Sequence, residues 1–440
     1  MRIATAAFLV TTLLRPPAGM AQAPTTPLDQ IERSILRHVD DHNAEALALL
    51  EKVVNINSGT MNFAGVRAVG AIFRAELDAL GFTTRWEEGA PYGRAGHLIA
   101  ERGTTGPRIL LIGHLDTVFE PDHPLQRFER LDSNRARGPG TTDMKGGDVI
   151  VVQALKALKA AGALDRMRIT VVFHGDEEHT GEPKHLARAT LLEAARRSDI
   201  AIGFEDGDGD PASAVIARRG IASWLLTSTG TPAHSSQVFR EDIGAGAIYE
   251  TARVLQQFRE KLSGDPLLTF NPGLALGGTA VDLDSARVRG GASGKMNIVA
   301  ERMMVAGDLR TISPERLVYA KNVMRAIVAD ALPKTRSEIS FEDGYPPMAP
   351  TDGNRRLLAI YDRVSRDLGF GPIGIDNPAR AGAADISFTS GIVPMAIDGL
   401  GLGGTGGHTA QETADLSALP MIAKRTAVLL YRLSARPAAP

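Results

Sequence analysis

The sequence predicts an α/β protein, built on an open, mostly parallel sheet with helices on both faces and carrying an inserted α+β domain. Short apolar runs at 108–113, 168–173 and 199–204 have the length and composition of strands that are buried on both faces. Helical patterns separate these runs, and such alternation argues for parallel pairing. At about residue 219 the order changes to strand–helix–strand–strand–helix–strand, which indicates the insert.

The elements of the first domain follow in chain order. Residues 29–55 and 62–81 have the periodicity of helices, and Gly81 is a suitable C-terminal stop for the second. Between the strands at 108–113 and 168–173, apolar residues recur every three positions, which predicts a helix over 149–162 that packs by one stripe.

In the insert we expect strands at 221–229, 273–282, 302–311 and 337–343, with helices at 243–262 and 314–332. Ser313 and Pro314 are typical of the start of a helix. The first pattern then returns, with a helix from about residue 355 and a strand near 392–397. The predicted division is a discontinuous first domain, 24–218 and 346–440, around an insert of 219–345.

Composition limits the possible functions. The chain has 440 residues, is 43% hydrophobic and has a formal net charge of −2, so it can bury a sizeable core, and no basic excess predicts binding to nucleic acid or an anionic membrane. The sequence has no cysteine. Disulfides, thiolate nucleophiles and Cys-ligated zinc are therefore excluded, and any metal ligands must be His, Asp and Glu.

The N-terminus has the pattern of a secretory signal peptide. Arg2 precedes an apolar stretch at 3–14, and an Ala-x-Ala pattern follows at 21–23. The stretch is too short for a permanent transmembrane helix, and no later segment has that pattern. We expect residues 1–23 to be a signal peptide and the mature protein to be periplasmic or secreted. The alternative is an N-terminal extension without regular structure.

Side chains that bind metals follow the predicted strands. They are His114 and Asp116, Asp176, Glu177 and Glu178, Glu205, and His408 in a glycine-rich loop. Asp143 lies in a further glycine-rich loop, just before the helix at 149–162. In an open α/β sheet the carboxyl ends of the strands form one edge, where ligand sites lie.

Each of these residues alone has an ordinary explanation. His114 and His408 could be hydrogen-bonded loop histidines, Asp143 could be a helix N-cap, and Glu205 could belong to a solvated acidic loop. Their joint position at one edge of the sheet favours a metal site instead.

The motifs that contain these residues resemble those of a known family. They are "GHLDTV", "GPGTTDMKGG", "GDEEHTG", Glu205 and "GGHTAQETADLSALP", with "GTPAHSS" and "GKMNIVAERMMVAGDLR" in the insert. The set resembles the co-catalytic zinc metallopeptidases and aminoacylases, which include glutamate carboxypeptidase, acetylornithine deacetylase, succinyl-diaminopimelate desuccinylase and related dipeptidases. Order and approximate spacing hold from about residue 30 to the C-terminus.

The resemblance implies two zinc ions per subunit, although Co²⁺ or Mn²⁺ could use the same ligands. It implies that His114 and Glu205 bind one ion, that Glu178 and His408 bind the other, and that Asp143 bridges both. Three protein ligands for each ion leave a position for water.

The resemblance also implies roles for residues that bind no metal. Asp116 would orient His114, and Glu177 would be the general base. His234 would stabilise the oxyanion from the partner subunit of a homodimer that forms through the inserted dimerisation or lid domain. Asn297 and Arg310 would hold the carboxylate of the substrate. The alternative for His234 is a loop histidine without contact to the substrate. Asn297 could be a turn residue, and Arg310 could form a surface salt bridge.

These expectations lead to an exported hydrolase that cleaves an amide bond next to a free carboxylate, as a carboxypeptidase or dipeptidase. An N-acyl-amino-acid deacylase would use the same groups, so that interpretation stays open. A catalytically inactive binding protein is a remote alternative, because every ligand and Glu177 are present. The stretches 206–214 and 342–350 lack Lys and Arg, so a neutral C-terminal residue is expected at least as much as glutamate.

Overall fold

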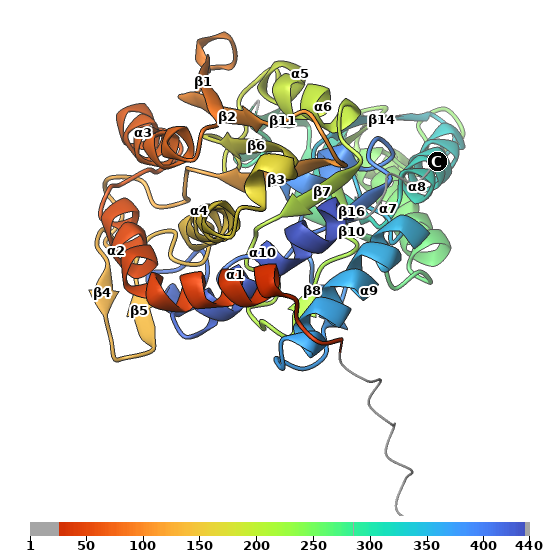
Figure 1. Ribbon diagram of the computed structural model, residues 1–440. Helices are drawn as coiled ribbons and strands as arrows, with labels where there is room; N and C mark the ends of the chain where they lie inside the picture. Colours follow the sequence, from red (N-terminus) through yellow and green to blue (C-terminus); the bar gives the residue numbers. More distant parts are fainter. Residues whose placement is uncertain (1–25, 285, 436–440) are drawn as a thin grey trace, which may run out of the picture.

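The computed structural model describes residues 26–284 and 286–435, so the expected signal peptide at 1–23 lies outside the described residues. A six-stranded sheet of order β1-β2-β6-β3-β7-β16 forms the centre of the molecule (Figure 1). Its strands are β1 (Thr83–Glu88), β2 (Gly96–Arg102), β3 (Arg108–His114), β6 (Arg168–His174), β7 (Ile200–Gly203) and β16 (Met395–Ile397). Only β2 runs against the other strands, which confirms the open, mostly parallel sheet.

Helices cover both faces of this sheet. Helices α1 (Gln30–Asp41), α4 (Lys145–Ala160) and α10 (Ala418–Ser434) pack against one another on one face (Figure 1), and α6 (Ala189–Arg196) lies on the other. Neighbouring residues of β3 alternate between these layers: Ile109 and Leu111 face the α4 side, whereas Leu110 and Ile112 face the α6 side.

Helix α4 differs from its prediction. The sequence predicts packing by one stripe, but almost every residue from Lys145 to Leu158 is buried. The helix is enclosed because the sheet lies on one side of it and α1, α2 (Asn43–Val54) and α10 lie on the others.

The helix predicted over 29–55 is two helices, α1 and α2, which meet at His42. Asp29 begins α1 with a reciprocal capping box to Glu32. At the other end, the Nδ1 atom of His42 lies 2.9 Å from the carbonyl oxygen of His38, and the two imidazole rings stack. Helix α3 (Phe63–Ala79) is as expected, and Gly81 follows it with a left-handed φ of 83°.

Residues 220–343 form a second sheet, of order β10-β13-β9-β14. Its elements are β9 (Gly220–Gly230), α7 (Ala247–Leu262), β10 (Thr269–Gly278), β13 (Arg302–Thr311), α8 (Pro314–Ala329) and β14 (Thr335–Asp343). The two helices cover one face and share a hydrophobic cluster with Trp224 and Leu226. Ser313 caps α8, as the sequence predicts. A hairpin, β11 (Ala280–Leu283) and β12 (Gly290–Ser293), is an addition that was not predicted.

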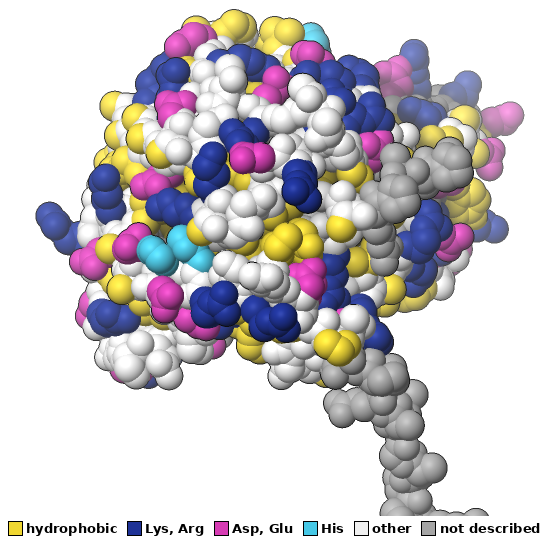
Figure 2. Space-filling view, in the orientation of Figure 1, with side chains coloured by type: hydrophobic (Ala, Val, Ile, Leu, Met, Phe, Trp, Pro, Cys, Tyr) yellow, Lys and Arg dark blue, Asp and Glu magenta, His cyan; other side chains and the backbone are white. Residues whose placement is uncertain are grey.

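The remaining elements connect these layers. They are β4 (Glu129–Arg130), β5 (Arg135–Arg137), α5 (Lys184–Ala187), β8 (Ser213–Ala214), α9 (Asp352–Asp367), β15 (Gly374–Ile375), β17 (Gly404–Thr405), β18 (Thr413–Asp415) and four 3₁₀ turns at 90–92, 164–166, 235–237 and 385–389. The face in Figure 2 carries acidic and basic side chains interspersed. None of the described helices is both long and apolar enough to cross a membrane.

Candidate metal centre

The fold brings the predicted ligand residues to one place. Three neighbouring parallel strands, β6, β3 and β7, end at the same edge and deliver the segments of Glu178, His114 and Glu205. Asp143 comes from the loop before α4. His408 comes from the turn between β17 and β18, where it adopts a left-handed φ of 62° beside two glycines.

Asp143 lies between two histidines. Its Oδ1 atom is 3.0 Å from Nε2 of His114, and its Oδ2 atom is 2.8 Å from Nε2 of His408. Each histidine also approaches a glutamate: His114 lies 3.5 Å from Glu205, and His408 lies 3.4 Å from Glu178. The five side chains therefore form two half-sites, each with one His and one Glu, which share one carboxylate.

Asp143 does not cap the following helix, although the sequence allowed that role. The residue at the N-cap position of α4 is Met144, and no side chain caps this end. Both oxygens of the Asp143 carboxylate are instead directed to the histidines.

The residues present fit a metal. Ligand atoms of His114, Asp143 and Glu178 lie within 4.8 Å of one another, and so do those of His114, Glu177 and Glu205. Among the described residues, the buried Oε1 atom of Glu178 has no hydrogen-bond partner. Imidazole and carboxylate donors suit zinc, cobalt and manganese.

The five candidate ligands form a cluster whose electrostatics favour a bound cation. Burial raises the pKa of Glu177 and of Glu178 well above the usual glutamate value, and burial together with the Asp143 charge raises the pKa of Glu205 to about 7. Burial acts in the same direction on Asp143, but hydrogen bonds from His114 and a second histidine lower the pKa of this carboxyl. Carboxyl groups crowded in this way are all ionised only when positive charge compensates them.

This cluster predicts that the metal-free protein loses stability as the pH rises from about 5 to about 8. Buried carboxyls with raised pKa values, such as Glu205 at about 7, keep protons in the folded state that the unfolded chain releases near pH 4.5. His114, whose pKa is raised, also binds its proton more tightly in the folded state. The folded state therefore holds more protons, and its stability falls as they leave.

The measurement is the Tm of chelator-treated protein at about pH 5.5 and about pH 8. Protein reloaded with metal should gain more in Tm at the higher pH, because metal ligands bind in their deprotonated forms. A Tm of the metal-free protein that rises over this range would contradict the proposed electrostatics.

Asp116 connects His114 to the loop that contains Glu177. The carboxylate of Asp116 accepts hydrogen bonds from the backbone N–H groups of Glu177 and Glu178, at 3.0 and 3.2 Å, and from the hydroxyl of Thr60 at 2.7 Å. Nδ1 of His114 lies 3.0 Å from the Asp116 carbonyl oxygen and 3.5 Å from its carboxylate. The backbone of Asp116 is thus closer to the imidazole than the side chain that the sequence singled out.

Two acidic residues that the sequence did not identify support the ligand loops. Glu412 accepts a hydrogen bond from the N–H of Thr142 at 3.0 Å, next to Asp143. Asp398 accepts from the N–H of Glu205 at 3.3 Å and pairs with Arg218 at 2.8 Å.

A buried arginine that the sequence did not identify contacts the residue before Glu177. Arg188 is fully buried and pairs with Asp176 at 2.6 Å and with Asp385 at 2.7 Å, and Asp385 also bonds to His174. Asp176 also accepts a hydrogen bond from the N–H of Gly181 at 2.8 Å, which stabilises the turn that contains it.

Three predicted residues lie on the second sheet and its loops, outside the cluster. His234 is exposed and bonds to Ser236 at 2.8 Å. Asn297 is exposed, and its carbonyl accepts from the N–H of Ser235 at 2.8 Å. Arg310 donates to Asp308 at 2.9 Å. Within residues 26–284 and 286–435 of one chain, no hydrogen bond joins these three side chains to the cluster of five candidate ligands.

Comparison with known proteins agrees with this geometry. The family model "Peptidase family M20/M25/M40" matches residues 110–432. Carboxypeptidase G2 of Pseudomonas sp. (strain RS-16) is 26% identical over 437 residues, covering 99% of this chain and 98% of that protein. Human aminoacylase-1 is 26% identical over 313 residues, covering 68% of this chain and 74% of that protein.

The fold is also found among solved structures. The YXEP protein of Bacillus subtilis, described as a dinuclear metal binding peptidase from the M20 family, superposes with a TM-score of 0.61 at 13% identity and covers 90% of this chain and 99% of its own. Since the family model spans most of the sequence and includes the metal-type cluster, the chain belongs to peptidase family M20/M25/M40 and is a metal-dependent hydrolase.

Proposed function

We propose that this protein is an exported di-zinc hydrolase that cleaves an amide or peptide bond next to a free carboxylate, as a carboxypeptidase or dipeptidase. The observation that carries the proposal is the position of Asp143, which bonds to His114 through one oxygen and to His408 through the other. A carboxylate shared between two imidazoles, each with its own glutamate, is suited to hold two ions side by side.

In this proposal His114, Glu205 and Asp143 hold one ion, and His408, Glu178 and Asp143 hold the other. The dinuclear description of the Bacillus subtilis relative supports two ions. When bound, such ions lower the pKa of a water molecule and polarise the scissile carbonyl.

Glu177 is the proposed general base. Its side chain is half-buried beside the cluster, and desolvation raises the pKa of its carboxyl, which suits a group that both accepts and returns a proton. Glu177 takes the proton of the attacking water and delivers it to the leaving amine. The second group of ligand atoms, His114, Glu177 and Glu205, would also admit Glu177 as a ligand. Glu177→Gln distinguishes the two roles, because loss of a ligand lowers the metal content whereas loss of a general base lowers only the rate.

The second sheet is proposed to bind the substrate carboxylate through Arg310 and Asn297 and to supply His234 to the oxyanion of a neighbouring subunit. We propose the division into 24–218 with 346–440, and 219–345, since the second sheet has a hydrophobic cluster of its own. The exposure of His234 and its separation from the cluster in one chain support a role across an interface.

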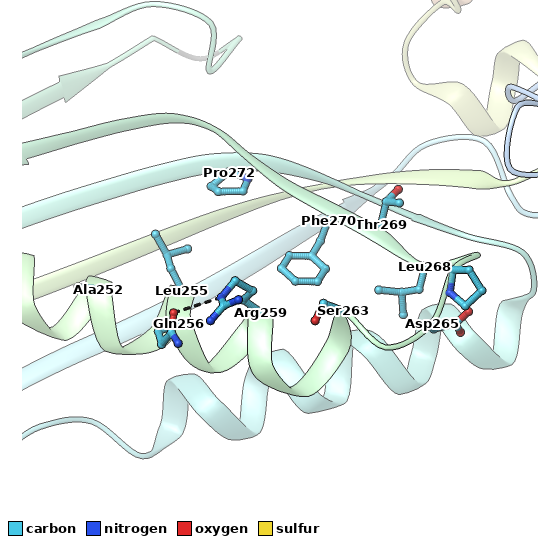
Figure 3. Close-up of a pocket in the computed structure, with 11 residues that line it drawn as sticks. Ala252, Leu255, Gln256, Arg259, Ser263, Asp265, Leu268, Thr269, Phe270 and Pro272 are labelled. Atoms are coloured by element: carbon cyan, nitrogen blue, oxygen red, sulfur yellow. Dashed lines mark hydrogen bonds between the residues drawn. The ribbon is translucent and has the colours of Figure 1, made fainter.

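A homodimer through the second sheet is part of the proposal. Strand β10 lies at the edge of this sheet and pairs with β13 alone among the described strands. Beside it, a groove between α7 and β10 is lined by apolar Leu255, Leu268, Phe270 and Pro272 and also by polar side chains of α7 (Figure 3). Tyr249 is another exposed apolar residue of α7. The edge strand and the groove together suit a twofold contact between two copies of the chain.

Deacylation of N-acyl amino acids is the alternative activity. The similarity to human aminoacylase-1 supports it, and the same metal ligands and carboxylate clamp would serve both reactions. Export to the periplasm or beyond is proposed from the N-terminal sequence alone.

A substrate screen tests the proposed function. Purified protein with zinc is assayed against dipeptides with neutral and acidic C-terminal residues, against N-acyl amino acids, and against the same compounds with the carboxylate amidated. The proposal predicts hydrolysis of peptides that have the free carboxylate and roughly a tenfold or greater loss of kcat/KM on amidation, about 1.4 kcal/mol or more. Preference for N-acyl amino acids would support the alternative, and equal rates on amidated substrates would contradict the carboxylate clamp.

A further inference from the structure

The backbone of Glu177 is held at both ends, and the two contacts come from different parts of the molecule. Asp116 accepts the N–H of Glu177 at 3.0 Å, and the hydroxyl of Tyr345 donates to the Glu177 carbonyl oxygen at 2.9 Å. In the described part of the chain, the Glu177 carboxylate has no hydrogen bond of its own. Its position therefore depends on backbone contacts, which are these two and the hydrogen bond of 3.2 Å from the N–H of Glu178 to Asp116.

Tyr345 is itself fixed by buried groups. Its hydroxyl accepts a hydrogen bond from Nη2 of Arg188 at 2.8 Å and lies 3.0 Å from the hydroxyl of Thr180. Arg188 also lies over the Tyr345 ring, 5.7 Å from its centroid, and the ring meets Phe388 edge to face. The Arg188 guanidinium can only donate and the Glu177 carbonyl oxygen can only accept. The Tyr345 hydroxyl therefore gives its single proton to Glu177 and accepts from Arg188 and from the Thr180 hydroxyl.

Tyr345 also lies where the chain leaves the second sheet. Strand β14 ends at Asp343, and the carbonyl of Tyr345 accepts a hydrogen bond from the N–H of Ile221 at 2.9 Å, near the start of β9. Gly344 donates back to the carbonyl of Ile221, also at 2.9 Å. Tyr345 is thus bonded on one side to the second sheet and on the other side to the backbone of Glu177.

We infer that Tyr345 is a positioning residue for Glu177. Through its hydrogen bond to the Glu177 backbone, Tyr345 fixes the position of the Glu177 carboxylate relative to the second sheet. This inference rests on the proposed role of Glu177 as the general base. Asp116 holds the N–H groups of Glu177 and Glu178, and Tyr345 holds the carbonyl oxygen that lies between them. Loss of the Tyr345 hydroxyl would let this segment shift, and small displacements of a proton-transferring group are costly to rate.

Tyr345→Phe tests the inference, because phenylalanine keeps the ring against Arg188 and Phe388 and removes only the hydroxyl. We expect kcat to fall about 10-fold, with KM within about twofold of wild type and metal content unchanged. Tyr431→Phe is the matched control. The Tyr431 hydroxyl makes a hydrogen bond of 2.8 Å to Asp29, just before α1, and neither residue belongs to the cluster, so its loss should leave kcat at the wild-type value.

A second measurement separates positioning from loss of folded protein. The rate on a peptide is compared with the rate on its depsipeptide, in which oxygen replaces the scissile N–H and the leaving group depends less on a proton from Glu177. A smaller folded fraction lowers both rates equally, whereas a displaced Glu177 lowers the amide rate more. We expect Tyr345→Phe to lower the amide-to-ester rate ratio by about threefold or more.

An unchanged kcat and an unchanged ratio in Tyr345→Phe would overturn the inference. Glu177→Gln, assayed in parallel, shows which idea has failed. If Glu177→Gln is inactive while Tyr345→Phe is fully active, only the positioning role is wrong. If Glu177→Gln is active, the proposed function of Glu177 is wrong as well.

Discussion

Glu177→Gln should lower kcat by roughly 10²–10⁴-fold while the protein keeps both metals. Glutamine has the shape of glutamate but cannot accept the proton of the attacking water or return it to the leaving amine. Asp116 and Tyr345 hold Glu177 only through its backbone, so the substitution should leave the loop in place. Steady-state kinetics with metal analysis of the same sample measures both effects.

Glu178→Gln is the matched control, because it makes the same chemical change one residue further along. Glu178 lies 3.4 Å from His408 and has a buried oxygen without a partner among the described residues, as expected of a ligand. We expect this variant to lose metal affinity, with activity that partly returns at high zinc. If Glu177→Gln loses metal and Glu178→Gln loses only rate, the two assignments must be exchanged.

His234→Ala should lower the rate by about 10²–10³-fold with metal content unchanged, because the oxyanion loses one hydrogen-bond donor. The side chain of His234 is exposed and, among the described residues of one chain, bonds only to Ser236. Its loss should therefore have little effect on the Tm. A large drop in Tm would indicate that the residue is structural.

Mixed dimers test whether His234 acts on the neighbouring subunit. His234→Ala and Glu177→Gln protein are combined under conditions that exchange subunits. Each mixed dimer then contains one complete site, with Glu177 from the first variant and His234 from the second. For random mixing, half the dimers are mixed and each has one good site of two, so activity should approach about a quarter of wild type. If activity does not recover although subunits have exchanged, His234 acts in the active site of its own chain or has no role in catalysis.

The sequence predicted the central sheet and the position of the cluster for one physical reason. Parallel strands that are buried on both faces have continuous apolar runs, and polar residues directly after such runs must lie at one edge. His114 and Glu205 were found in this way. His408 could be predicted as a ligand because its glycine-rich loop follows a predicted strand. In the structure it lies in the turn between two short strands, β17 and β18.

Other features left no comparable signal. Strand β2 has only a short apolar run, at 98–100, and helix α10 is buried nearly all round, so neither has a clear amphipathic period. The break at His42 involves no glycine or proline in the sequence, only a histidine that bonds to the preceding turn.

Buried polar partners were the hardest to predict. Arg188 lies at the turn between α5 and α6, where an arginine normally faces solvent, and its pairing with Asp385, 197 residues later, is set by tertiary structure alone. Tyr345 likewise follows a strand of the second sheet, and only the fold brings its hydroxyl to Glu177. Residues that act through long-range contacts have no local pattern.

The number of metal ions per chain tests the central claim most directly. Protein purified without chelators and dialysed against metal-free buffer is analysed by elemental mass spectrometry, together with Asp143→Ala. The proposal predicts close to two ions per wild-type chain, with zinc predominant, and loss of both ions with activity in Asp143→Ala, because this carboxylate belongs to both half-sites. Full activity in wild-type protein that contains no metal would contradict the account.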